Sequence, residues 1–304
     1  MRIVFMGTPD FAVPVLDALH RHPDHEVLAV VTVPDHMGGR NRTKRLESAI
    51  KKYAVKENLP VLQPEKLNNS RFLNELRALK PDCIIVVAFK KLPKLVWSIP
   101  KYGTINLHAS LLPAYRGAAP INHAIIQGEK ETGMTTFYID ENIDTGKILL
   151  QDRMPIHRDD TAGSLYSRMM ESAGELVLNT LRGIENGTLK PVPQDDGEAS
   201  NAPKVFFDQN EINFNQKTEI LYNFIRGMSP YPAAWIRYDG KILKIYFAIP
   251  VEKSHSHAPG EITTDYKSYF RIYTKDGYLD ITDLQIEGKR RMKIADFLNG
   301  LQPD

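Results

Sequence analysis

The sequence predicts an α/β protein in which a mainly parallel sheet flanked by helices is followed by a small β-barrel domain. Three observations favour this fold class. Apolar, β-branched runs alternate with amphipathic segments through residues 1–189, at the spacing of β-α-β units. Residues 190–206 are rich in Pro, Asp, Gly and Ser and lack apolar periodicity, which is typical of a linker. Residues 207–304 contain short strand-like runs separated by tight turns.

The first domain is predicted to be Rossmann-like, because strand and helix patterns alternate along it. The first strand, Arg2–Met6, ends at Gly7, which stands alone and forms no G-x-G-x-x-G motif, so a dinucleotide site is not favoured. Asp159, Asp160 and Thr161 are candidates for capping the last helix. The predicted strands are 2–6, 27–33, 60–62, 83–88, 104–108, 133–139 and 147–154, and the predicted helices are 11–19, 46–58, 69–79, 118–127 and 161–185.

Residues 207–304 are predicted to form the small β-domain. The strongest signal is Asp239-Gly240, which joins the strand patterns Ala233–Tyr238 and Lys241–Ile249 as a hairpin turn. A short helix is predicted at 218–227, and further strands at 260–264, 269–274 and 278–285. Five short strands suit an OB-like barrel, and a β-sandwich is the alternative that the strand pattern leaves open.

Length and composition indicate a globular chain of two domains. It has 304 residues, of which 42% are hydrophobic and 25% charged. No apolar run approaches the ~20 residues of a membrane-spanning helix, and the amino terminus lacks a signal-peptide layout, so we expect a cytoplasmic protein without a membrane partner. Cys83, the only cysteine, is expected to be a buried apolar side chain. The net charge of +2 requires a polyanionic partner to be bound by a local patch.

Residues 104–117 contain the strongest chemical signal. The strand Thr104–His108 places Asn106 and His108 on one face, at a carboxyl end where open α/β sheets bind ligands. A carboxylate follows in the turn Asp144-Thr145-Gly146. An amide donates to an oxyanion, an imidazole exchanges protons near neutral pH, and a carboxylate orients the imidazole or relays a proton. Taken singly these residues fit a turn cap and a core histidine, but the ordered set predicts acyl transfer to an amine.

Basic and histidine-rich segments are weaker signals. The run Arg40-Asn41-Arg42-Thr43-Lys44-Arg45 follows the second strand, near the edge where Asn106 is expected, which favours phosphate binding over a solvated surface. A second basic run, Lys289–Lys293, lies in the small domain. The histidines at 20, 22 and 25 and at 255 and 257 lack the further ligands of a metal shell, so no metal is predicted.

The motifs resemble those of the 10-formyltetrahydrofolate-dependent formyltransferases. The stretch NLHASLLPAYRGAAPI, residues 106–121, is similar to the central signature of that family. The flanking motifs MGTPDFA, ETGMT, IDTG and APK, which begin at residues 6, 131, 143 and 202, occur in the family's order. The resemblance extends over nearly the whole chain and is greatest to the members that formylate the methionine carried by initiator tRNA.

This resemblance implies both a reaction and a set of site residues. The reaction is transfer of a formyl group from 10-formyltetrahydrofolate to the amino group of initiator methionyl-tRNA, for translation initiation. Asn106 is expected to donate to the formyl oxygen, His108 to stabilise the oxyanion and assist proton transfer, and Asp144 to orient His108 or relay a proton. The expected folate-lining residues are Ser110, Leu111, Leu112 and Pro113, and the expected tRNA-binding residues are Arg40, Arg42, Lys44 and Arg45. The OB-like domain is also expected to contact tRNA, and we expect a monomer.

The sequence leaves other functions open. It departs from the family's pattern at Lys90-Lys91, at Asn213-Phe214 and in the length of the basic loop. Another folate-dependent enzyme, acting on a sugar amine or hydrolysing formyltetrahydrofolate, would share the same trio. A glycinamide ribonucleotide formyltransferase fits less well, because one domain suffices there. A non-catalytic RNA-binding protein would not need the trio.

Overall fold

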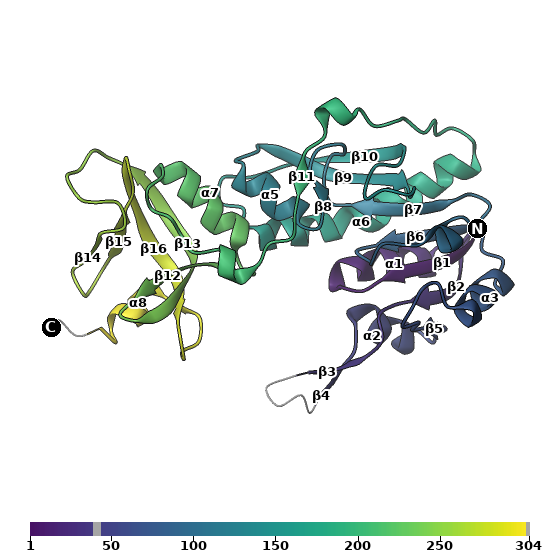
Figure 1. Ribbon diagram of the computed structural model, residues 1–304, viewed down its shortest axis with the longest axis horizontal. Helices are drawn as coiled ribbons and strands as arrows, with labels where there is room; N and C mark the ends of the chain where they lie inside the picture. The colour runs from purple at the N-terminus through teal and green to yellow at the C-terminus, as the bar shows by residue number, and fades with distance from the viewer. Residues whose placement is uncertain (39–43, 302–304) are drawn as a thin grey trace. The chain divides into compact units, whose positions relative to one another are not determined.

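Figure 1 shows the computed structural model of the chain, which describes residues 1–38 and 44–301. Its contacts divide the chain into two units. The first consists of residues 1–117, 133–154 and 166–201, and the second of residues 118–132, 155–165 and 202–304. Each unit has a main sheet of its own.

The first unit contains a seven-stranded sheet in the order β10-β9-β7-β6-β1-β2-β5. β1 runs parallel to β2 and β6, β2 to β5, and β6 to β7, whereas β9 is antiparallel to β7. The chain moves outward from β1 to β5 and then returns to place β6 on the other side of β1, which creates a topological switch point. The predicted mainly parallel, Rossmann-like sheet is confirmed. The strands are β1 (Arg2–Gly7), β2 (Glu26–Val31), β5 (Val61–Leu62), β6 (Cys83–Val87), β7 (Thr104–His108), β9 (Glu131–Tyr138) and β10 (Ile148–Pro155).

This sheet is buried on both faces. Helices α3 (Ser70–Ala78) and α4 (Lys94–Trp97) pack with Val4 and Met6 of β1 in one core cluster. The alternate residues Ile3 and Phe5 are equally buried, as a covered second face requires.

Two further helices of this unit pack against each other. α1 (Val13–Arg21) approaches α6 (Ala162–Glu185) at Gly174, where an added Cβ would lie 2.7 Å from the Cβ of Ala18. The predicted cap of α6 is present at Thr161, whose hydroxyl accepts from the Ser164 N–H while the Ser164 hydroxyl accepts from the Thr161 N–H.

The structure differs from the sequence prediction around the basic run. A helix was expected from Leu46, but β3 (His36–Gly38) and β4 (Lys44–Leu46) form an antiparallel hairpin, and α2 (Ala49–Lys56) begins after it. Ser48 caps α2 by accepting from the Lys51 N–H, which fixes the later start. Pairing across the hairpin therefore takes precedence over the helical pattern at Leu46.

The second unit contains a six-stranded antiparallel sheet that curls into a half-barrel, which confirms the predicted small β-domain. The predicted hairpin turn is present, because Asp239 (φ 48°) and Gly240 (φ 68°) both adopt the left-handed conformation of a type I′ turn. The strand order is β12-β13-β16-β15-β14, with β17 paired to β16. The strands are β12 (Ala234–Tyr238), β13 (Lys241–Glu252), β14 (Ile262–Thr264), β15 (Phe270–Tyr273), β16 (Gly277–Ile286) and β17 (Met292–Lys293).

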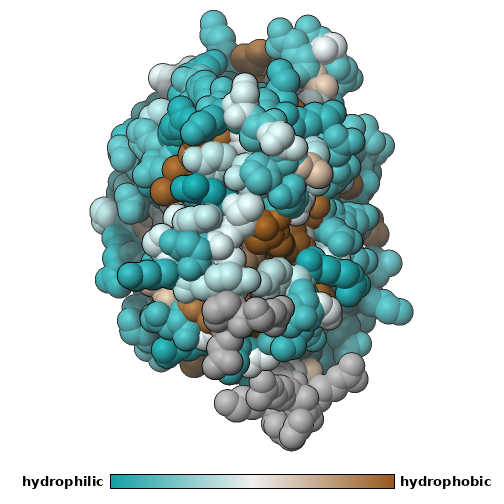
Figure 2. Space-filling view, turned by 90° about the vertical axis from the view of Figure 1, so that its left-hand side faces the viewer, coloured by the Kyte–Doolittle hydropathy of each residue, from teal (hydrophilic) through white to brown (hydrophobic). Residues whose placement is uncertain are grey.

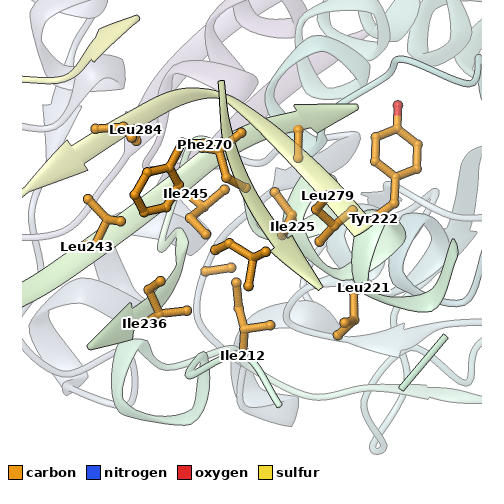
Figure 3. Close-up of a cluster of buried hydrophobic side chains, with 14 of the residues drawn as sticks. Ile212, Leu221, Tyr222, Ile225, Ile236, Leu243, Ile245, Phe270, Leu279 and Leu284 are labelled. Carbon is orange, nitrogen blue, oxygen red and sulfur yellow. The ribbon is translucent and has the colours of Figure 1, made fainter. Parts of the chain in front are cut away.

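The core of the second unit lies between this sheet and its helices (Figure 3). Helix α7 (Thr218–Met228) contributes Leu221, Tyr222 and Ile225, and α8 (Ile294–Leu298) closes one end. Helix α5 (Pro120–Ile126), although early in the chain, packs on α7. The absence of a side chain at Gly227 permits this, since a Cβ there would lie 2.5 Å from Cγ1 of Ile126.

The segment expected to be a linker is held in place by hydrogen bonds. β11 (Asn201–Ala202) pairs with β8 (Arg116–Gly117), and Val192 forms an isolated bridge with Ile148 of β10. Two 3₁₀ turns, η2 (Asp196–Glu198) and η3 (Phe207–Gln209), lie on either side of β11. Residues 192–202 are therefore part of the ordered structure around β8.

The face of the molecule in Figure 2 is hydrophilic over most of its area, with small separate hydrophobic patches. In the part of the chain that the structure describes, no helix has the length and apolar character needed to cross a bilayer.

Candidate active site

The candidate site begins at the carboxyl end of β7, beside the topological switch of the sheet. β7 lies between β6 and β9, where Asn106 is in register with Val86 and Phe137. The Asn106 Oδ1 atom is buried, and no described residue forms a hydrogen bond with it. A buried amide oxygen without a partner is costly, so its presence at this end of the sheet indicates a ligand-binding position.

His108, two residues further on, is almost fully buried and has one fixed hydrogen bond. Its Nε2 lies 2.8 Å from the carbonyl oxygen of Tyr115. Because a carbonyl only accepts, Nε2 must carry the hydrogen, and Nδ1 of the neutral ring is then a free lone pair. Nδ1 lies 3.7 Å from Oδ2 of Asp144, which is too long for a direct hydrogen bond. The imidazole and the carboxylate therefore face each other at a separation that lets both contact a third group.

Asp144 is held in a tight turn with a left-handed backbone conformation, φ 57°. Its Oδ2 accepts a hydrogen bond from the Gly117 N–H at 2.9 Å. Asp140 stabilises the turn by two hydrogen bonds inside it, because its Oδ1 accepts from the Asn142 N–H and from the Thr145 hydroxyl. The carboxylate is thus fixed by its own turn and by the segment that follows His108.

Two residues that the sequence analysis did not assign complete this arrangement. An added Cβ at Gly146 would lie 1.6 Å from the Tyr138 carbonyl oxygen, so only glycine allows the turn to pass so close to β9. Gln194 donates through Nε2 to the carbonyl oxygens of Asp144 and Gly146, and its Oε1 accepts from Arg116. Gly146 was visible in the D-T-G motif, but Gln194 lies in a polar stretch with no periodicity to mark it.

The residues expected to line the folate site, Ser110, Leu111, Leu112 and Pro113, form the loop after β7. The Ser110 hydroxyl donates to the Ala114 carbonyl at 2.6 Å, so it closes the loop on itself. Leu112 is buried, with its N–H bonded to Thr135 Oγ1 and its carbonyl accepting from Gln151. Leu111 and Pro113 are partly exposed. The two exposed side chains are therefore the ones available to a ligand, and the other two hold the loop.

The basic run is only partly described. Arg40 and Arg42 lie outside the described residues, and Lys44 begins β4. Arg45 is described, and its Nε donates to Asp35 Oδ2 at 2.7 Å. The same carboxylate accepts from Lys51 and Gln63, and these hydrogen bonds lower the pKa of Asp35 to about 2. Asp35 therefore anchors the base of the β3–β4 hairpin as an anion.

Comparison with known proteins fits this geometry. The formyl transferase family model matches residues 1–181, and the model of the formyl transferase C-terminal domain matches residues 204–302. A methionyl-tRNA formyltransferase of Parabacteroides distasonis is 48% identical over 99% of this chain and 96% of its own length. One of Flavobacterium johnsoniae is 44% identical over 99% of this chain and 96% of its own length. This chain belongs to the methionyl-tRNA formyltransferase family. The family resemblance stated from the motifs is confirmed.

The fold of this chain also resembles the folds of solved structures. A methionyl-tRNA formyltransferase from Clostridium thermocellum matches with a TM-score of 0.58 and 18% identity, over 90% of this chain and 99% of that one. An N-formyltransferase of Helicobacter canadensis, solved with folinic acid and dTDP-3-aminofucose, matches with a TM-score of 0.69 and 23% identity, over 92% of this chain and 97% of that one. The two structures therefore show that this chain shares its fold with both proteins.

Proposed function

We propose that this chain transfers the formyl group of 10-formyltetrahydrofolate to the amino group of methionine on initiator tRNA, as a monomer in the cytoplasm. The observation that supports the chemistry is the placement of Asn106, His108 and Asp144 at the carboxyl end of β7, with a buried amide oxygen on Asn106 that no described residue satisfies. The name shared by its curated relatives at 44–48% identity supports the acceptor.

The reaction needs only these groups and two substrates. The methionyl amine attacks the formyl carbon, a C–N bond forms, and the carbonyl oxygen becomes an oxyanion in a tetrahedral intermediate. The bond from that carbon to N10 of the folate then breaks. One proton leaves the attacking amine and one arrives at N10, so the products are the formamide and tetrahydrofolate.

In this mechanism Asn106 stabilises the oxyanion. Rotation of its terminal amide exchanges Oδ1 and Nδ2, so the position of the unpartnered oxygen is equally a position for an N–H donor. A single such donor, aimed at the charge that develops in the transition state, accelerates acyl transfer by roughly 10²–10³-fold.

His108 and Asp144 are assigned to the proton. Because Nε2 is committed to the Tyr115 carbonyl, Nδ1 is the reactive nitrogen. A neutral ring accepts a proton there, and a protonated ring donates there to the oxyanion. The Asp144 carboxylate, 3.7 Å away, can pass the proton onward through a bridging water.

Substrate binding is assigned to both units. In the first unit, Ser110–Pro113 shapes the folate site, with Leu111 and Pro113 as its exposed apolar contacts, and the basic run Arg40, Arg42, Lys44 and Arg45 binds the acceptor end of tRNA.

In the second unit, the outer face of β12 and β13 is basic and interleaved with aromatic rings. Trp235 is in register with Lys244, and Arg237 lies on the same face two residues further along β12. Lys244 Nζ lies 4.8 Å from the ring of Phe207, and the Arg237 guanidinium lies 5.9 Å from the ring of Trp235. Cations held in this way against aromatic rings suit the phosphates of RNA.

An acceptor panel tests the proposal. The purified chain is incubated with 10-formyltetrahydrofolate and, separately, initiator methionyl-tRNA, elongator methionyl-tRNA, a dTDP-amino sugar, or buffer alone. We expect formylation of initiator methionyl-tRNA at a kcat/KM at least ~10²-fold above the other acceptors, a discrimination of the size that polar recognition supplies. Preferred formylation of the amino sugar, or release of formate in buffer at a comparable rate, would overturn the assignment.

A further inference from the structure

Gln194 joins the two segments that hold the reactive side chains. Its Nε2 donates to the carbonyl oxygens of Asp144 at 2.9 Å and of Gly146 at 2.8 Å. Its Oε1 accepts from Nε of Arg116 at 3.0 Å and from Nη2 at 2.8 Å. All four hydrogen-bonding positions of the amide are therefore used.

This pattern fixes both the orientation and the chemical identity of the side chain. A flipped amide would point its N–H groups at the guanidinium and its oxygen at two carbonyls, so only one orientation is compatible. Glutamate would have nothing to donate to the carbonyls, and methionine, of similar shape, could make none of the four bonds.

Arg116 belongs to the segment that also holds the reactive groups directly. The preceding residue, Tyr115, accepts from His108 Nε2, and the next, Gly117, donates to Asp144 Oδ2. The Arg116 side chain is only 13% exposed, and the backbone N–H of Arg116 donates to the Ser200 carbonyl. Gln194 thus ties the 144–146 turn to the same three residues that set the position of His108.

The turn needs such a tie, because Asp144 has a positive φ of 57° that a non-glycine residue adopts only when its surroundings enforce it. Gln194 hydrogen-bonds to the backbone carbonyl group of that residue and to the carbonyl group of Gly146, two residues further along the turn. We propose that Gln194 is a positioning residue for formyl transfer: oriented by Arg116, it fixes the Asp144 turn and with it the 3.7 Å separation of carboxylate and imidazole. The catalytic part of this inference rests on the proposed function.

The test combines kinetics with a measurement that needs no substrate. In the full chain, Gln194→Met and Gln194→Glu should each lower kcat by about 10–100-fold, since misplacement of a reacting group by about 1 Å has effects of that order. KM for both substrates should stay within about threefold, because no substrate contact is lost. Hydrogen–deuterium exchange of residues 138–148 should become faster in both variants. The control is Asp196→Asn, which removes the negative charge of the exposed partner of Arg116 without touching Gln194 and should change kcat by less than about twofold.

A double-mutant cycle separates a positioning role from a general structural one. If Gln194 acts through Asp144, then Gln194→Met should have little further effect on kcat in an Asp144→Ala background. An equal loss in both backgrounds would refute the positioning role, as would unchanged exchange of the turn together with wild-type kcat. If the wild type formylates nothing, the proposed function fails, but faster exchange of the turn in Gln194→Met and Gln194→Glu would still support the tie.

Should Gln194→Met not fold, Arg116→Lys provides the second route, because an ammonium cannot reproduce the two bonds of the guanidinium to Oε1. It is expected to reduce kcat in the same direction and to accelerate exchange of residues 138–148. Wild-type values for both in Arg116→Lys would contradict the inference.

Discussion

The hydrogen bonds that individual side-chain atoms already form determine which atoms of each active-site residue remain available for chemistry. His108 has Nε2 bound to a carbonyl, so its chemistry is confined to Nδ1, which faces Asp144. Ser110, which looks like a candidate ligand in the sequence, has its hydroxyl committed to the Ala114 carbonyl. Asn106 is the reverse case, a partly exposed residue whose buried amide oxygen no described residue satisfies. The division between reactive and supporting side chains follows from these bonds.

The first prediction concerns the trio. Asn106→Ala, His108→Ala and Asp144→Ala should each lower the turnover of formyl transfer by at least ~10²-fold, because each removes a group that acts on charge or a proton in the transition state. Binding of tRNA should remain near normal. The effects should be far from additive in the triple variant if the residues act as one unit. Single-turnover formylation with tRNA titrations measures both, and near-wild-type turnover of His108→Ala would refute the assigned mechanism.

The second prediction concerns Gly146. An added Cβ would lie 1.6 Å from a β9 carbonyl oxygen, so Gly146→Ala must displace the turn or the strand and should destabilise the fold by about 1–3 kcal/mol, as overpacking typically does. Turnover should fall as well, since Asp144 lies two residues away. Gly300→Ala, where the nearest atom is 3.5 Å from the added Cβ, is the matched control and should change neither. Denaturant unfolding and formylation assays compare the two, and equal stability of both variants would contradict the prediction.

At the level of elements, short pairings that look like loops in the sequence place the functional segments. Lys44 and Arg45, the described residues of the basic run, belong to β4 of the β3–β4 hairpin, whose base is fixed by Asp35. The β8–β11 pair brings residues 192–202 back to the loop after β7. These pairs are only two or three residues long, and a side-chain hydrogen bond lies beside each, from Arg45 to Asp35 in the first and from the Tyr115 N–H to the Ser200 hydroxyl in the second.

The third prediction is the pH dependence of the hairpin anchor. Hydrogen bonds from Lys51, Gln63 and Arg45 lower the pKa of Asp35 from its ordinary value of 3.8 to about 2. A depressed pKa means that the anchor contributes its full stability above about pH 3.8 and loses it as the pH falls through about 2. The carboxyl ¹³C shift of Asp35 should therefore titrate near pH 2, and in Lys51→Met it should titrate closer to 3.8. An unshifted titration in the wild type would show that the anchor is not formed in solution.

The fourth prediction tests the outer face of β12 and β13. Replacing Arg237 and Lys244 by glutamine should weaken tRNA binding and flatten its dependence on salt by up to about 0.9 per lost phosphate contact, using the duplex-DNA slope as a guide. Replacing Lys253 and Lys267 by glutamine changes the net charge equally in exposed loops of the same unit and is the control. Titrations of tRNA at several salt concentrations compare the two. The same salt slope in both double variants would remove this face from the proposed tRNA surface.

For the whole molecule, the two units are interleaved along the chain. Residues 118–132 and 155–165 have their contacts in the second unit, although the first unit surrounds them in sequence. Asn122 on α5 donates to the Gly227 carbonyl at the end of α7, and the buried Arg226 guanidinium donates to the Asp160 carbonyl. Part of the second unit is therefore formed by residues 118–132 and 155–165, which lie within the first 189 residues of the chain.

The fifth prediction follows from this interleaving. A fragment of residues 1–201 keeps α5 but loses α7, so the apolar side chains of α5, which are buried in the full chain, become exposed. We expect the fragment to bind a hydrophobic dye and to unfold at a temperature several degrees lower and less cooperatively than the full chain, because lost apolar burial is lost stability. Thermal unfolding with dye binding checks this. A fragment as stable as the full chain would mean that the contacts of α5 with α7 contribute little.

The sequence by itself determined the alternation of strands and helices, the β7 strand with Asn106 and His108 on one face, the D-T-G turn, and the hairpin at Asp239-Gly240. Each of these is written in a local pattern, either a periodicity or a turn residue with a required φ, so neighbouring residues suffice to predict it. The tertiary structure decided the rest. The β3–β4 hairpin replaced the expected start of a helix at Leu46, α5 joined the second unit, and Gln194 reached the Asp144 turn from about fifty residues away in the chain. These features depend on partners distant in sequence, and a polar side chain such as Gln194 carries no local signal of the carbonyl groups that it will meet.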